Sequence, residues 1–106
     1  GLAYANGEGV EKNDKEAVKW YQKAAEQGQV NAQYNLGWMY ANGRGVEQNY
    51  VTAYAWANIA AANGEALAKK FKKEFLEKKM TAEDISKAQA LSKEMVKKHP
   101  ELIQKK

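Results

Sequence analysis

The chain has 106 residues, no cysteine and a formal net charge of +4. This length suits one domain with a hydrophobic core, and without cysteine there is no disulfide, thiolate nucleophile or thiolate metal ligand. No apolar run approaches the roughly 20 residues of a membrane-spanning helix. A composition rich in Ala, Lys, Glu and Gln, with a single proline, favours an all-α class.

The predicted elements begin with the end of a truncated helix over residues 1–6 and a glycine turn over residues 7–10. Asp14 is suited to an N-cap, so a helix is predicted over residues 15–27, ending at Gly28. Its apolar residues recur at helical spacing and should face the core: Ala17, Trp20, Tyr21, Ala24 and Ala25.

A second helix is predicted over residues 30–41. Its inward face holds Ala32, Leu36 and Tyr40, and Gly37 provides a flat spot for close approach of a neighbouring helix. Another glycine turn, over residues 42–46, then leads to a helix over residues 50–63. That helix is apolar on nearly every side, which predicts burial on both flanks and a core position for its tryptophan, Trp56.

After Gly64 a third unit begins and then leaves the earlier pattern, because lysines replace Leu36 and Gly37. It keeps one apolar face, formed by Leu67, Phe71, Phe75 and Leu76.

Thr81 should cap a last helix over residues 82–98. Pro100 should end or kink this helix, and Leu102 with Ile103 should either fold back or fray. The predicted inward residues of the helix are Ile85, Ala88, Leu91, Ser92 and Met95.

Sliding the sequence on itself by 36 residues reveals an internal repeat, and a period in the mid-thirties is typical of helical solenoids. The matching positions include the pairs Tyr4 and Tyr40, Gly7 and Gly43, Gly9 and Gly45, Trp20 and Trp56, and Gly28 and Gly64.

The second copy of the repeat contains the pattern Leu36-Gly37-x-x-Tyr40-x-x-Gly43-x-Gly45-Val46, followed by Ala53-x-x-Trp56 and Ala60-Ala61-x-x-Gly64. This pattern resembles the Sel1-like repeat. The resemblance covers residues 1–68 and implies the right-handed α/α superhelix shared with tetratricopeptide repeats. It also implies an adaptor that binds other proteins. Residues 65–106 look like the closing helix and C-terminal capping helix of bacterial members, so the chain is expected to be the C-terminal portion of such a protein.

Catalysis finds little support in the sequence. The one histidine, His99, lies among lysines beside Pro100, and the repeated Gly-x-Gly pairs lack the preceding strand of a phosphate-binding loop. No carboxylates have metal-ligand spacing. We therefore predict a protein that is not an enzyme and needs no cofactor or metal.

Binding is predicted on the helix over residues 30–41. Asn31, Tyr34 and Trp38 point roughly 160° away from its core face. In a tetratricopeptide-like arrangement this side lines the concave surface, so these residues and Asn42 would meet a protein or peptide partner. The alternative is that Tyr34 and Trp38 pack on the preceding helix or on the helix that carries Phe71.

Two further hypotheses concern other surfaces. Residues 65–106 hold 12 basic and 7 acidic side chains, so the lysines from Lys69 to Lys98 could bind an acidic polymer: nucleic acid, a cell-wall polymer or an anionic membrane. Interleaved carboxylates disfavour nucleic acid among these. The open N-terminal flank could instead mediate self-association. The family's exported bacterial members point to the periplasm or cell envelope.

Overall fold

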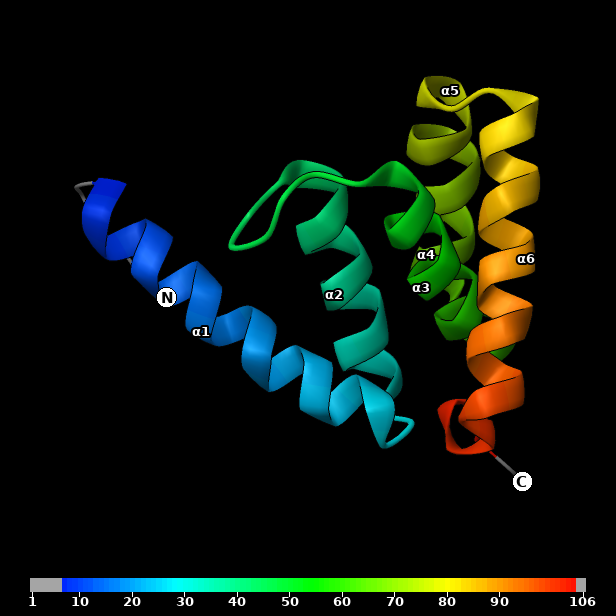
Figure 1. The fold of residues 1–106 in the computed structure, drawn as a ribbon, viewed down its shortest axis with the longest axis horizontal. Coiled ribbons are helices and arrows are strands. Elements are labelled where there is room, and N and C mark those ends of the chain that lie inside the picture. Colours follow the sequence, from blue (N-terminus) through cyan, green and yellow to red (C-terminus); the bar gives the residue numbers. More distant parts are fainter. Residues whose placement is uncertain (1–6, 105–106) are drawn as a thin grey trace.

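The computed structural model describes residues 7–104 and is all-helical over that range (Figure 1). Helix α1 packs on α2, α2 packs on α3, and α3 packs against both α4 and α6. The elements are α1 (Gly7–Glu26), α2 (Val30–Asn42), α3 (Tyr50–Ala62), α4 (Ala66–Phe71), the π-helical turn η1 (Lys72–Leu76), α5 (Glu77–Lys79), α6 (Ala82–Lys98) and the 3-10 turn η2 (Pro100–Leu102). The all-α repeat architecture is confirmed.

The start of α1 corrects two predictions. The helix begins at Gly7, so the predicted turn over residues 7–10 and the N-cap at Asp14 are wrong. Glu and Lys, which favour helix, dominate residues 8–16, and their spacing at i and i+4 supports a continuous helix. Asp14 lies inside the helix and accepts a hydrogen bond from Arg44 Nε at 2.7 Å. The predicted helical end over residues 1–6 lies outside the described residues.

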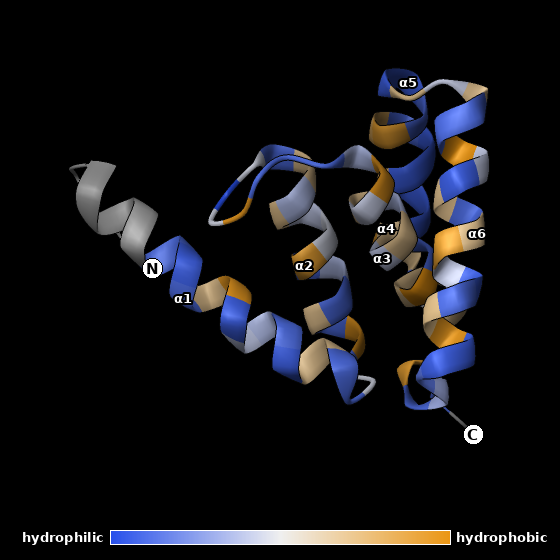
Figure 2. Ribbon diagram, in the orientation of Figure 1, coloured by the Kyte–Doolittle hydropathy of each residue, from blue (hydrophilic) through white to orange (hydrophobic). Residues whose placement is uncertain are grey.

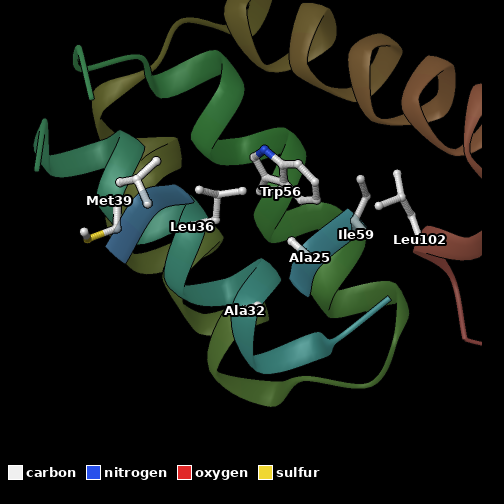
Figure 3. Packing of buried hydrophobic residues seen from close by; sticks show 8 residues of the cluster. Ala25, Ala32, Leu36, Met39, Trp56, Ile59 and Leu102 are labelled. Carbon is white, nitrogen blue, oxygen red and sulfur yellow. The ribbon is translucent and has the colours of Figure 1, made fainter. Parts of the chain in front are cut away.

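The two repeat-matched tryptophans have different environments, which corrects the prediction for Trp20. Trp56 is only 4% exposed and belongs to the main core cluster with Leu36 and Leu102 (Figure 3). Val18 of α1 belongs to the same cluster. Trp20 is 75% exposed. The side of α1 that enters the core is the one carrying Val18 and Ala25, and among the described residues no helix covers the opposite side.

Close contact between α2 and α3 confirms the role predicted for Gly37. A Cβ atom at this position would lie 3.1 Å from the carbonyl oxygen of Ala53, tighter than almost all such contacts. The predicted glycine turn is also present, with φ of +63° at Gly43 and +77° at Gly45, values that glycine adopts readily. Helix α3 is buried along most of its length, as its all-round apolar sequence predicts.

The capping helix α6 has its predicted bounds, and Thr81 Oγ1 accepts a hydrogen bond from the Asp84 N–H at 3.0 Å. Apolar and hydrophilic positions alternate along it (Figure 2). Beyond it the chain folds back instead of fraying, since Leu102 is fully buried in the same cluster as Trp56.

A buried polar network, which the sequence patterns missed, fastens this C-terminal segment. Gln33 Nε2 donates to the carbonyl oxygens of Ala25 at 3.1 Å and Leu102 at 2.9 Å, and Gln33 Oε1 accepts from Asn63 Nδ2 at 2.8 Å. The backbone N–H of Gln104 then donates to Asn63 Oδ1 at 2.8 Å, and its side-chain Nε2 donates to the Gly28 carbonyl at 2.9 Å. The network joins the ends of α1 and α3, helix α2 and the C-terminal segment.

The tryptophan pair offers a matched stability test. Trp56→Ala should lower the free energy of unfolding by about 3 to 5 kcal/mol, because it empties a core position. Trp20→Ala should change it by less than about 0.5 kcal/mol, because the side chain is exposed. Urea denaturation followed by circular dichroism measures both, and equal losses would contradict the different burial of the two rings.

Gln33→Leu should destabilise the protein by about 1 to 3 kcal/mol. The substitution roughly preserves volume but removes three hydrogen bonds of the buried Gln33 side chain, each of which contributes about 0.5 to 1.5 kcal/mol. Gln22→Leu is the control, because within the described part of the chain Gln22 forms a single side-chain hydrogen bond, an exposed one to Glu26. Thermal unfolding compares the two, and a Gln33→Leu protein as stable as its control would show that the network contributes nothing.

Candidate functional site

A shallow groove lies between α2 and the α4–η1 segment. Its volume is about 260 Å³, and it is lined by Tyr34, Leu67, Lys70, Phe71, Glu74 and Phe75. Both walls derive from the first helix of a repeat unit, because residues 66–76 follow α2 by one 36-residue period.

Three aromatic rings form a continuous row in this groove. Tyr34 meets Phe71 edge to face with ring centroids 5.9 Å apart, and Phe71 stacks on Phe75 at 5.2 Å with an interplanar angle of 8°. The ammonium group of Lys79 lies 5.2 Å from the centre of the Phe75 ring. Both geometries are favourable for aromatic pairs and for cation–π contact.

The four predicted partner-binding residues have different environments in the structure. Tyr34 is half-buried against Phe71, as the packing alternative predicts, whereas Trp38, one turn further along α2, is 38% exposed. Asn31 is exposed at the start of α2. Asn42 is also exposed, but its Nδ2 donates to the Trp38 carbonyl at 2.9 Å and so serves the end of the helix.

Sequence reasoning missed the charged residues of the groove, although the repeat register contained the signal. Lys70 and Glu74 follow Tyr34 and Trp38 by 36 residues, and both line the groove. The apolar face predicted for the third unit is partly open, since Leu67 is 56% exposed. Phe71 and Phe75 are half-buried and Leu76 is buried.

On the side away from the groove, the π-helical turn η1 and the residue after it are bonded to α3. The Glu77 N–H reaches back five residues to the Lys72 carbonyl, and the Tyr54 hydroxyl donates to Glu77 Oε2 at 2.9 Å. Lys72 Nζ donates to Asn58 Oδ1 and lies 5.3 Å from the centre of the Tyr54 ring. Burial raises the pKa of Tyr54 and lowers the pKa of Lys72. These contacts hold the segment that presents Phe71 and Phe75.

Other kinds of site have less support within residues 7–104. His99 is exposed, with Nδ1 3.8 Å from a carboxylate oxygen of Glu101. The described part of the chain contains no group of three or more His, Cys, Asp or Glu side chains arranged to hold a metal. None of its helices combines the length and apolar character needed to span a membrane.

Comparison with known proteins places this geometry in context. The family model described as Sel1 repeat matches residues 1–29 and 30–65. Among solved structures, a protective antigen present in uropathogenic Escherichia coli strains and displaying an SLR fold shares 41% sequence identity, with a TM-score of 0.75 over 91% of this chain. The match covers 21% of the antigen, so the chain spans about a fifth of its length. No curated protein matches significantly.

Proposed function

Since the chain belongs to the Sel1 repeat family, we propose that it is a binding module that holds a peptide segment of a protein partner in the groove between α2 and α4–η1. Sel1 repeats generally mediate protein–protein interaction and are typically not enzymes. In this proposal the repeats of residues 1–68 supply one wall, and the closing part, residues 65–106, supplies the other.

The aromatic row is the observation that carries the proposal. Tyr34, Phe71 and Phe75 bring ring surface from two repeat units into one groove, where a ligand side chain can bury apolar area against them. Aromatic side chains that are partly accessible are frequent anchors of protein interfaces. Trp38 does not line the groove, but it follows Tyr34 by one helical turn on α2 and is 38% exposed, so in this proposal it continues the aromatic surface.

The size and charge of the groove favour a peptide over a metabolite. Small-molecule sites usually enclose about 300 to 1,000 Å³, whereas this groove holds about 260 Å³ and is shallow. Lys70 and Glu74 place one charge of each sign beside the rings. A segment with an aromatic or aliphatic anchor flanked by charged residues is complementary to this arrangement.

Selection from a phage-displayed random peptide library provides the test. Peptides selected on the wild-type protein should bind the Trp38→Ala and Tyr34→Ala variants at least about tenfold more weakly, which corresponds to about 1.4 kcal/mol of lost anchor contact. Isothermal titration calorimetry measures the dissociation constants. Thermal unfolding of each variant separates loss of binding from loss of folding, which matters most for the half-buried Tyr34.

Trp20→Ala is the matched control, because it removes an exposed tryptophan from α1, outside the groove. Its affinity for the selected peptides should equal that of the wild type. Peptides that tolerate Trp38→Ala and Tyr34→Ala but lose affinity with Trp20→Ala would contradict the proposal and favour α1 as the binding surface.

A further inference from the structure

We infer that the outer side of α3 carries a second docking groove, which takes an acidic amphipathic helix of a protein partner. Two hollows adjoin there, with volumes of about 620 Å³ between α3 and the α4–η1 segment and about 500 Å³ between α3 and α6. Asn58 and Ala62 line both hollows, so the outer surface of α3 forms a common floor.

Lysines form both walls of this groove. Among the described residues, Glu77 is the one acidic side chain that lines the two hollows, and it already accepts a hydrogen bond from the Tyr54 hydroxyl. By contrast, Lys87 and Lys98 on α6 lie 3.7 Å and 3.6 Å from carboxylates of their own helix. The lysines that line the groove are Lys69, Lys70, Lys72, Lys73, Lys93 and Lys97.

The charges of the walls are largely uncompensated. Lys69, Lys73, Lys93 and Lys97 form no ion pair with any residue in the described part of the chain. Lys72 Nζ donates a hydrogen bond to Asn58 Oδ1, and burial lowers the pKa of the Lys72 ammonium group. A carboxylate placed between the walls would therefore stabilise the charged form of Lys72 and pair with its neighbours.

The floor of the groove is apolar, which favours a partner that has an apolar face. It is formed mainly by Ile59, Ala61, Ala62, Val96 and Ile103. A helix that lays apolar residues at i, i+3, i+4 and i+7 on this floor would direct flanking carboxylates to both walls. Nucleic acid fits less well, because the described residues that line the two hollows include no arginine and no aromatic ring. An acidic protein segment therefore replaces the nucleic acid, cell-wall polymer or anionic membrane that the sequence suggested as the partner of this basic surface.

The probe is a fluorescein-labelled helical peptide of about 14 residues, with leucine at i, i+3, i+4 and i+7 and glutamate at the flanking positions. Fluorescence anisotropy should show saturable binding that the double substitution Lys69→Glu with Lys73→Glu weakens at least about tenfold. Lys19→Glu with Lys23→Glu makes the same charge change on exposed α1 positions and should have a much smaller effect. Equal weakening by the two pairs would overturn the inference.

Ala62→Lys separates apolar docking from attraction to charge alone. It adds a positive charge but obstructs the floor, so it should weaken the amphipathic peptide, whereas Ala90→Lys on the exposed side of α6 should not. Tighter binding of the peptide to the Ala62→Lys variant than to the wild type would overturn the inference. So would a wild-type protein that binds a scrambled peptide, or an oligothymidine of the same charge, as tightly as it binds the amphipathic peptide. Circular dichroism confirms folding of each variant.

Trp38→Ala should leave binding of the amphipathic peptide unchanged, because Trp38 lies outside the outer groove. The experiment can therefore contradict the outer groove without contradicting the proposed peptide site between α2 and α4–η1, and the reverse.

Discussion

The buried side-chain amide of Gln33 joins parts of the chain that lie far apart in sequence. It donates to the carbonyl oxygens of Ala25 and Leu102 and accepts from Asn63, so α2 is bonded at one point to the end of α1, the end of α3 and the C-terminal segment. Each such hydrogen bond contributes about 0.5 to 1.5 kcal/mol. The three bonds together therefore hold α2, the ends of α1 and α3 and the C-terminal segment in one arrangement.

The orientation of α2 follows from this constraint and determines the candidate site. Gln33 precedes Tyr34 directly, and its hydrogen bonds fix the position of α2 next to the point where the Tyr34 ring meets Phe71. Gly37, one helical turn further along, sets how closely α2 approaches α3 through its contact with the Ala53 carbonyl. The aromatic groove is thus positioned by two residues that contribute no atom to its lining.

The predictable parts of the fold were those determined locally. Caps, helix-ending glycines and apolar periodicity placed α2, α3 and α6 within about two residues of their observed ends, and the 36-residue period indicated the family. Trp20 was misplaced because its burial depends on a covering helix, which a repeat-matched position does not guarantee. Gln33 was missed because its repeat partner is Lys69, so the repeat gave no sign of a buried amide.

The third unit explains why one short segment contributes to both proposed surfaces. Where α2 has Leu36 and Gly37, this unit has Lys72 and Lys73, and charged residues at these positions oppose the close packing that continues a solenoid. The same lysines line one wall of the outer groove, while Phe71 and Phe75 turn towards Tyr34. Lys70 lines both the aromatic groove and the outer groove. The substitutions that interrupt the repeat pattern thereby give α4–η1 an aromatic side and a basic side, each suited to a different peptide chemistry.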